Sequence, residues 1–500
     1  MSVVLAIDAG TTGVRTYAVD EGGRPLRSTY REFPQHFPRP GWVEHDPEEI
    51  WDAVSSTLED CVGQCAEAND GVVAIGITNQ RETAVVWDRR DGRIPHRAIV
   101  WQDRRTAARG EELRDAGHES LVRELTGLVL DPYFTATKLE WLLTEGGVEP
   151  HPDLCFGTVD SWLLWKLTGG TDGGVHATEA SNASRTMLFD IQRLAWSAEL
   201  TALFGVPESC LAEVRPSGGR FGVTAEGTPL PTGVPISGIL GDQQAALFGQ
   251  ACHEAGQGKN TYGTGSFVLL NAGTQAPEAQ EGLLTTIAWG LHDEVDYALE
   301  AAIFVTGAAV QWLRDGLGII GNAAETQALA ESLDSNEGVY FVPALTGLGS
   351  PYWDPYARGT ILGLTRGSGP AHFARAALEA IAYQTADAVR AQERAAGRPL
   401  TELKADGGAV ANAWLMQFQA DVLGVPVSVP EIAETTALGA AYLAGIAVGV
   451  WDVAEVGERW REAARYEPQM GADERHSLTA EWSRAVERAR GWAGAESSSK

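Results

Sequence analysis

VVLAIDAGTTGVRTYAVD, at residues 3–20, places a glycine–threonine turn between two apolar stretches. This pattern predicts a β-hairpin. Residues 259–273, KNTYGTGSFVLLNAG, repeat the pattern, because a turn rich in Gly and Thr again leads directly into an apolar strand. Two such hairpins, each at the start of about half of the chain, predict an α/β protein of two duplicated lobes with a cleft between them.

The rest of the chain alternates predicted strands and helices, as an α/β fold requires. An amphipathic helix is predicted over residues 46–68 and a strand over residues 71–78. The glycine-rich stretch HEAGQGKN, at residues 253–260, separates the two halves. We therefore expect an N-terminal lobe of residues 1–252 and a C-terminal lobe of residues 253–500.

The composition excludes several classes of protein. The chain has 38 Lys and Arg residues against 67 Asp and Glu residues, which gives a formal net charge of −29. This acidic balance argues against nucleic-acid binding, which needs clustered basic residues. No apolar run is long enough to span a membrane, and the first residues lack the basic segment of a signal peptide. We therefore expect a cytoplasmic protein with no nucleic-acid partner and no membrane insertion.

The first glycine–threonine turn has the residues of an anion site. The backbone N–H groups of such a turn bind anions, and the hydroxyls of Thr11 and Thr12, beside Gly13, add donors. Arg15 is near enough to reach a phosphate, and Asp8, at the end of the first strand, suits Mg²⁺. One such turn alone is equally consistent with an ordinary hairpin.

The second turn, around Thr264, favours an anion site over an ordinary hairpin, because two facing turns would hold a triphosphate from both lobes. A third glycine patch, ADGGAVAN at residues 405–412, lies between a predicted strand and a predicted helix. Its Gly408 and Asn412 suit a base or ribose that lies against the backbone. By itself, this patch is also consistent with a simple strand-to-helix turn.

Polar residues next to predicted strand ends are further candidates. ILGDQQAALFGQ, at residues 239–250, ends an apolar strand at Asp242, which we predict to be the N-cap of a helix. Arg81 and Glu82 stand at a break between two strands, where adjacent side chains can reach one ligand. Taken alone, Arg81 and Glu82 fit a solvated surface pair better than a binding site.

Seven stretches of the chain resemble the FGGY carbohydrate kinase family, and in particular its glycerol kinases. They are GITNQRETAVVWD (76–88), IVWQDRR (99–105), DPYFTATKLEWLL (131–143), ILGDQQAALFGQ (239–250), NTYGTGSF (260–267), LTGLGSPYWDPYARGTILGLTRG (345–367) and DGGAVANAWLMQFQAD (406–421). The similarity extends over nearly the whole chain. It implies two duplicated lobes of the actin-like, or ribonuclease H-like, type, with the nucleotide and the substrate bound in the cleft between them.

The resemblance also implies the reaction. It is the transfer of the γ-phosphoryl group of ATP to a terminal hydroxyl of glycerol, which gives sn-glycerol 3-phosphate and ADP at the entry to glycerol catabolism. Asp242 corresponds to the general base. The residues that correspond to the substrate contacts are Arg81, Glu82, Tyr133, Asp242 and Gln243, with Trp101 and Phe267 as an apolar wall. Such a pocket gives each hydroxyl a partner and covers the C–H faces.

The nucleotide site implied by the resemblance draws on both halves of the chain. Its residues here are Thr11, Thr12, Gly13, Arg15, Thr264, Gly307, Gln311, Gly408 and Asn412, with Asp8 and Asp242 as ligands of Mg²⁺. The family often has Ser where this chain has Gly13. We therefore expect a backbone N–H group to replace that hydroxyl.

The stretch GVTAEGTPLPTGVPISG, at residues 222–238, departs from the family in another way, because it contains neither Arg nor His. Some bacterial members carry a glycine–arginine loop here that binds fructose 1,6-bisphosphate, and others carry a histidine that becomes phosphorylated. We expect neither form of regulation. We do expect a homo-oligomer, either a dimer or a tetramer.

Three alternatives stay open at this point. The chain is consistent with an FGGY kinase for another polyol or a ketose such as xylulose, although the Arg81, Glu82, Trp101 and Phe267 set favours a short pocket. An actin-like filament or a chaperone ATPase shares the nucleotide cleft but needs no polar pocket with aromatic walls. A regulator that has lost catalysis conflicts with the intact Asp242 and both intact hairpins.

Overall fold

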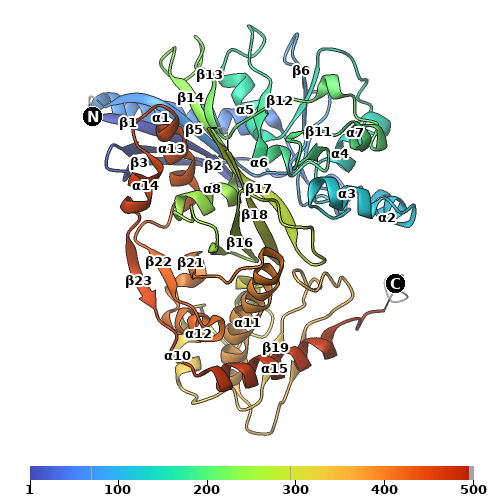
Figure 1. Ribbon diagram of the computed structural model, residues 1–500, viewed down its shortest axis with the longest axis vertical. Coiled ribbons are helices and arrows are strands. Elements are labelled where there is room, and N and C mark those ends of the chain that lie inside the picture. The colour runs from blue at the N-terminus through green and yellow to red at the C-terminus, as the bar shows by residue number, and fades with distance from the viewer. Residues whose placement is uncertain (69, 293, 495–500) are drawn as a thin grey trace.

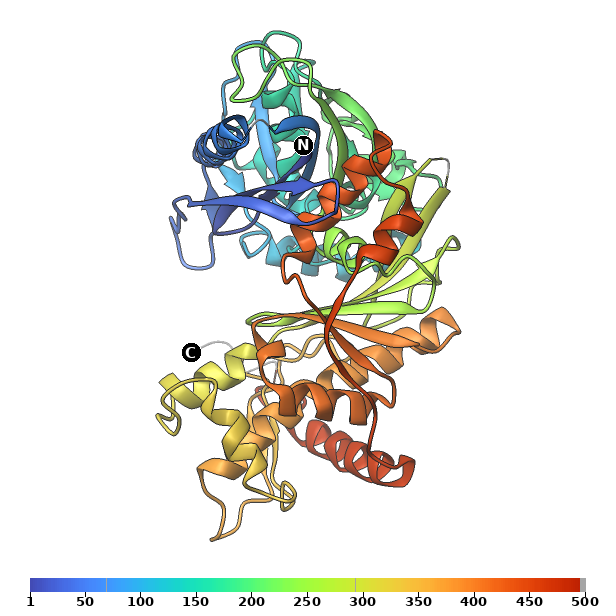
Figure 2. The same ribbon diagram turned by 90° about the vertical axis from the view of Figure 1, so that its left-hand side faces the viewer.

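Apolar strands pair into one twisted sheet that passes through both lobes of the molecule. The computed structural model describes residues 1–68, 70–292 and 294–494, so residues 495–500 of the predicted C-terminal lobe lie outside the described residues. Within the described ranges, thirteen strands pair in the order β23-β22-β21-β15-β16-β18-β17-β13-β14-β5-β1-β2-β3. Figures 1 and 2 show two lobes above and below a narrow waist.

The two halves of this sheet have the same topology, which confirms the predicted duplication. In the first half, β1, β2 and β3 are antiparallel, and β5 and then β14 continue the sheet in parallel on the other side of β1. In the second half, β15, β16 and β18 form the antiparallel part, and β21 and β22 continue in parallel from β15. The first set is β1 (Ser2–Ala9), β2 (Gly13–Asp20), β3 (Pro25–Glu32), β5 (Gly71–Asn79) and β14 (Pro235–Gly241); the second is β15 (Gln257–Tyr262), β16 (Ser266–Gly273), β18 (Glu294–Ile303), β21 (Glu402–Gly407) and β22 (Val427–Pro430).

Three further strands complete the large sheet. β13 (Gly218–Val223) and β17 (Leu284–Leu291) meet at the Gly218–Leu291 pairing and so join the two halves. β23 (Glu462–Tyr466) pairs with β22 at the outer edge of the second half. The domain boundary that we predicted at residue 252 falls between α8 (Asp242–Gly249) and β15.

Helices cover both faces of the sheet in the first lobe, because its central strand is apolar on both sides. Val3, Leu5 and Ile7 of β1 pack in the cluster that contains α1 (Pro47–Glu67) and α5 (Val159–Leu167). The alternate residues Val4 and Ala6 pack in the cluster that contains α13 (Thr435–Ala447). The predicted cap of α1 is confirmed, since the Asp46 carboxylate accepts the Glu48 N–H at 3.0 Å.

The second lobe is built around one long helix. α11 (Pro370–Ala396) packs with α12 (Ala413–Leu423) and α15 (Ala472–Ala489) in the cluster that includes the apolar residues of β16 and β18. The remaining helices are α2 (Ala107–Asp115), α3 (Glu119–Thr126), α4 (Ala136–Thr144), α6 (Ala180–Ala183), α7 (Ala198–Leu203), α9 (Gly307–Asp315), α10 (Glu325–Glu331) and α14 (Val453–Arg459). The remaining strands are β4 (Glu44–His45), β6 (Val85–Asp88), β7 (Ala98–Ile99), β8 (Leu154–Gly157), β9 (Ala177–Glu179), β10 (Phe189–Asp190), β11 (Ala195–Trp196), β12 (Glu213–Arg215), β19 (Tyr340–Val342) and β20 (Thr360–Leu362).

All five cysteines of the chain are buried free thiols. Within residues 1–68, 70–292 and 294–494, no helix combines the length and apolarity needed to cross a membrane.

α13, from the C-terminal part of the chain, packs closely against the sheet of the first lobe. The helix follows β22 of the second lobe, yet it lies against the sheet of the first lobe, where Figure 2 shows it in red beside the blue strands. The backbone of α13 comes so near to β5 that a Cβ atom on Gly76 would lie 2.1 Å from the carbonyl oxygen of Ala440. Only glycine permits this approach.

We predict that Gly76→Ala destabilises the first lobe, because the added methyl group has to push α13 away from the sheet. The cost of such overpacking, about 3 kcal/mol, corresponds to a fall in melting temperature of about 6 °C or more for a lobe of this size. Gly63→Ala is the matched control, since Gly63 lies inside α1 and a Cβ atom there meets nothing within 4 Å. Differential scanning calorimetry of both variants makes the comparison, and equal melting temperatures would show that the Gly76 contact is unimportant.

Candidate active site

The ends of three parallel strands bring the predicted site residues together. β14 pairs with β5 up to Gly241 and Asn79, and β1 pairs with β5 up to Ala9 and Asn79. Asp8, Arg81 and Asp242 therefore come from neighbouring strand ends, although they are far apart in the sequence. In open α/β sheets this edge is where ligands bind.

Asp242 opens α8, but not in the way that the sequence predicted. The predicted N-cap role is wrong: Gly241 is the N-cap, and Asp242 is the first residue of the helix. The strand runs up to Gly241 and the helix begins at Asp242, one position earlier than the cap pattern implied. The Asp242 carboxylate accepts the backbone N–H of Gln243 at 2.7 Å, and 31% of its side chain stays exposed. A carboxylate with this exposure is accessible to a substrate.

The guanidinium group of Arg81 is the centre of the site. Its Nε lies 3.2 Å from the Asp242 carboxylate and 3.6 Å from that of Glu82, and its Nη2 donates to the Tyr133 hydroxyl at 3.2 Å. Its Cζ lies 5.9 Å from the centre of the Phe267 ring. Arg81 therefore contacts four of the other residues predicted to bind substrate.

The aromatic wall connects this centre to the first glycine–threonine turn. The Trp101 ring meets the Tyr133 ring edge to face, with their centres 5.6 Å apart. The indole N–H of Trp101 donates to the hydroxyl of Thr11 at 3.0 Å. The predicted substrate wall and the predicted phosphate loop are thus in direct contact.

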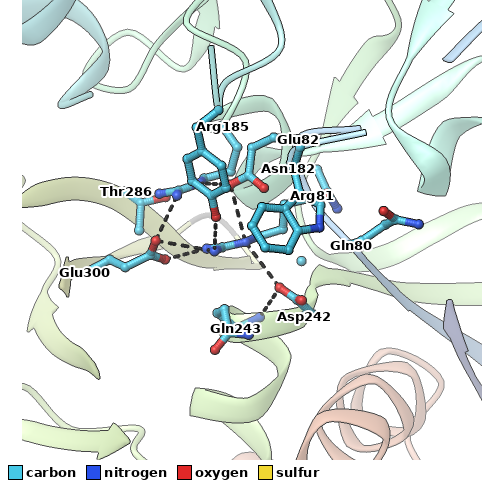
Figure 3. Close-up of polar contacts among 12 residues, drawn as sticks. Gln80, Arg81, Glu82, Asn182, Arg185, Asp242, Gln243, Thr286 and Glu300 are labelled. Carbon is cyan, nitrogen blue, oxygen red and sulfur yellow. Dashed lines mark hydrogen bonds and ion pairs between the residues drawn. The ribbon is translucent and has the colours of Figure 1, made fainter. Parts of the chain in front are cut away.

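Two buried charged residues that the sequence reasoning missed complete the centre (Figure 3). Glu300, on β18, pairs with Arg81 and accepts a hydrogen bond of 2.8 Å from Nη2 of Arg185. Arg185 Nε donates to Glu82 at 2.8 Å. The only sequence signal for Glu300 was an acidic residue in the apolar run YALEAAI (297–303), and Arg185 gave none.

Three further polar residues form hydrogen bonds with the residues around Arg81. Lys259 Nζ, on β15, donates to the side-chain oxygen of Gln243 at 2.5 Å, and burial lowers its pKa to about 8. Gln244, which the sequence left without a role, accepts from Arg81 at 3.3 Å. Lys138 Nζ donates to the carbonyl oxygens of Tyr133 and Phe134 at 2.6 and 2.9 Å.

The predicted first phosphate loop is in tight contact with β3. A Cβ atom on Gly13 would lie 2.6 Å from the Tyr30 hydroxyl and 2.8 Å from the Arg31 carbonyl oxygen. This chain therefore has no room for the serine that the family often carries there. Arg15 pairs with Asp8 across the hairpin register and lies over the Tyr30 ring, 4.8 Å from its centre.

The predicted second phosphate loop is hydrogen-bonded to the start of α9. The N–H of Gly307 donates to the carbonyl oxygen of Gly263 at 3.1 Å, and the N–H groups of Thr306 and Ala308 donate to that of Thr264 at 2.9 and 3.0 Å. Gln311 lies exposed one turn further along α9. These contacts bring Thr264 and Gly307 together and place Gln311 on the same helix as Gly307.

The third glycine patch lies at the end of β21. Gly408 is exposed in a short 3-10 turn, and Asn412 is the N-cap of α12. The Asn412 side chain accepts the Leu415 N–H at 3.0 Å and donates to Thr326 at 3.3 Å. Asn412 therefore serves the local fold, and its contact with a nucleotide stays a prediction.

The carboxylates of Asp8 and Asp242 suit a shared cation. Burial, reinforced by the negative charge of Asp242, raises the pKa of Asp8 to about 7, although Arg15 opposes the shift. Burial also raises the pKa of Asp242, although Arg81 opposes it. Among the described residues, no group of three or more His, Cys, Asp or Glu side chains forms a metal cage. Two acidic residues without a cage fit Mg²⁺, which is usually bound by one or two carboxylates together with substrate phosphates and water.

Comparisons with known proteins identify the family of the chain. Residues 3–249 match the N-terminal domain, and residues 258–448 the C-terminal domain, of the "FGGY family of carbohydrate kinases". The chain is 52% identical to "Glycerol kinase 2" of Thermotoga maritima, over 98% of this chain and 99% of that protein. It is 54% identical to a glycerol kinase of Symbiobacterium thermophilum, with the same coverage.

A solved structure supports the same assignment. The crystal structure of Plasmodium falciparum glycerol kinase with ADP matches this chain with a TM-score of 0.93 and 34% sequence identity. The match covers 98% of this chain and 98% of the Plasmodium chain. The two-lobed actin-like fold is therefore confirmed. The chain belongs to the FGGY family of carbohydrate kinases.

Proposed function

We propose that this chain phosphorylates glycerol with ATP and releases sn-glycerol 3-phosphate and ADP. The proposal rests on one observation above all: Arg81 contacts Glu82, Tyr133, Asp242 and Phe267 within a single small group. Donors, acceptors and an apolar wall in so small a space suit a short triol. The full-length similarity to proteins named as glycerol kinases supports the same substrate.

In this proposal, the pocket divides the substrate between polar and apolar partners. The hydroxyl groups of glycerol bind Arg81, Glu82, Tyr133, Asp242 and Gln243, and its carbon backbone lies between Trp101 and Phe267. Each buried hydroxyl then has a hydrogen-bond partner, and a polyol that leaves one of these partners unpaired binds less well.

The nucleotide is proposed to lie between the two hairpins. Backbone N–H groups and hydroxyls of the first loop, at Thr11, Thr12 and Gly13, face those of the second loop at Thr264, with Arg15 at the first. Gly307, Gln311, Gly408 and Asn412 are proposed to border the adenosine. The lobes 1–252 and 253–500 would then each contribute one side of the cleft.

Asp242 is proposed to act as the general base. It accepts the proton of the attacking hydroxyl while that oxygen forms a bond to the γ-phosphorus and the bond to the oxygen of ADP breaks. Positioning and charge contribute most of the catalysis in such a transfer. When bound by Asp8 and Asp242 with phosphate oxygens, Mg²⁺ supplies positive charge that stabilises the phosphates.

We also propose a cytoplasmic location and a homo-oligomer, a dimer or a tetramer. The five buried free thiols support the first point, because a reducing compartment keeps cysteines in this form. Light scattering on the purified protein measures the second.

We predict that Asp242→Asn lowers kcat by at least about 100-fold, because it removes the base but keeps the size of the side chain. The melting temperature should change little, since the carboxylate is partly exposed. Steady-state release of ADP in the presence of glycerol measures the effect. Asp190→Asn is the control, because Asp190 is buried and its carboxylate has local partners: it accepts the backbone N–H groups of Gln192 and Arg193 and lies 3.6 Å from Arg193 Nε. Turnover by Asp242→Asn close to that of the control would exclude the proposed base.

We predict a strong preference for glycerol among polyols and ketoses. The proposed pocket around Arg81 suits a three-carbon substrate, so the longer erythritol and xylulose should have kcat/KM values at least about 100-fold below that of glycerol. The kcat/KM for dihydroxyacetone should lie between the value for glycerol and the values for these two longer compounds. Release of ADP with each compound separates glycerol from the rival substrates. Faster turnover of xylulose than of glycerol would overturn the proposal.

A further inference from the structure

The buried carboxylate of Glu300 is the feature that the proposed reaction leaves unused. Glu300 is 0% exposed and lies on β18, where it pairs in register with Leu269 of β16 and Leu284 of β17. Both neighbours are apolar, so nothing in the sheet itself requires a charge at this position. The carboxylate of Glu300 instead points toward the guanidinium groups of Arg81 and Arg185 (Figure 3).

Glu300 holds two guanidinium groups at once. One carboxylate oxygen pairs with Nη1 of Arg81, and the other accepts from Nη2 of Arg81 at 3.3 Å and from Nη2 of Arg185 at 2.8 Å. Arg185, which is also 0% exposed, forms a second ion pair, with Glu82. The four buried residues thus alternate positive and negative charge, an arrangement that buried ions require.

The contacts of Glu300 fix the direction in which Arg81 points. Glu300 binds Nη1 and Nη2 of Arg81, and in this orientation of the guanidinium group Nε faces Asp242 and Nη2 also faces Tyr133. Without the carboxylate, two buried positive charges would face each other with Glu82 and the partly exposed Asp242 left to neutralise them. Both would move, and Glu82 would move with Arg185.

Glu300 also belongs to the other lobe. β18 lies in the antiparallel part of the second-lobe sheet and pairs with β16, whose first residue follows the loop at Thr264. Arg81, Glu82 and Arg185 all belong to the first half of the chain. The proposed substrate pocket therefore draws on both halves of the chain, since Phe267 and Glu300 both come from the second.

We propose that Glu300 is a positioning residue for the polyol site, which aligns Arg81 directly and Glu82 through Arg185. This inference rests on the proposed function, because the polyol is taken to be glycerol. Burial alone would raise the pKa of Glu300, but Arg185 and Arg81 lower it to about 2, so the carboxylate stays charged at every pH at which the enzyme is assayed.

The test compares Michaelis constants for the two substrates. Glu300→Gln keeps the shape and removes the charge, so the KM for glycerol should rise at least about tenfold while the KM for ATP stays within about twofold of the wild-type value. Glu379→Gln is the matched control, since Glu379 is 3% exposed and pairs with Arg375 at 2.9 Å in the second lobe. It should lose stability without any change in either KM.

A second variant covers the case in which Glu300→Gln does not fold. Glu300→Asp keeps the charge but shortens the side chain, and its KM for glycerol should rise at least about threefold. An unchanged KM for glycerol in the folded variants, or an equal rise in both KM values, overturns the positioning role. If the wild-type chain itself does not turn over glycerol, the proposed function fails instead, and the two failures are therefore distinguishable.

Discussion

The ion pair between Arg81 and Glu300 is the interaction on which the site depends. Both side chains are almost fully buried, and removing one partner of such a pair typically costs about 3–5 kcal/mol. The pair is held in place by the sheet that passes through both lobes, because Arg81 follows β5 and Glu300 lies on β18. The geometry of the substrate pocket is thus a consequence of how the two duplicated halves join.

The duplication places equivalent features on opposite sides of one cleft. Each half contributes a hairpin with a glycine–threonine turn, and each turn is fixed by a local contact, with β3 at Gly13 and with the start of α9 at Gly307. The Asp242 carboxylate, the proposed general base, lies at the start of α8, immediately before the chain crosses into the second lobe. The return of α13 to the first lobe makes the two halves interdependent at a second place.

Local patterns predicted the fold, because hairpins and amphipathic helices leave periodic signals in the sequence. The duplication and the capped helix after Asp46 were predicted from such patterns, whereas the actin-like architecture was implied only by the family resemblance. The start of α8 was misplaced by one residue, since a preferred cap residue can also occupy the first helical position. Glu300 and Arg185 escaped detection because their roles arise from contacts more than 100 positions away in the sequence.

A double-mutant cycle between Arg81 and Glu300 tests the central claim most directly. The value of kcat/KM for glycerol is measured in the wild-type chain, in Arg81→Gln, in Glu300→Gln and in the double variant. If Glu300 acts through Arg81, adding Glu300→Gln to Arg81→Gln should lower kcat/KM by no more than about threefold, against at least about tenfold in the wild-type background. Losses that multiply in full would show that the two residues act independently and would contradict the account.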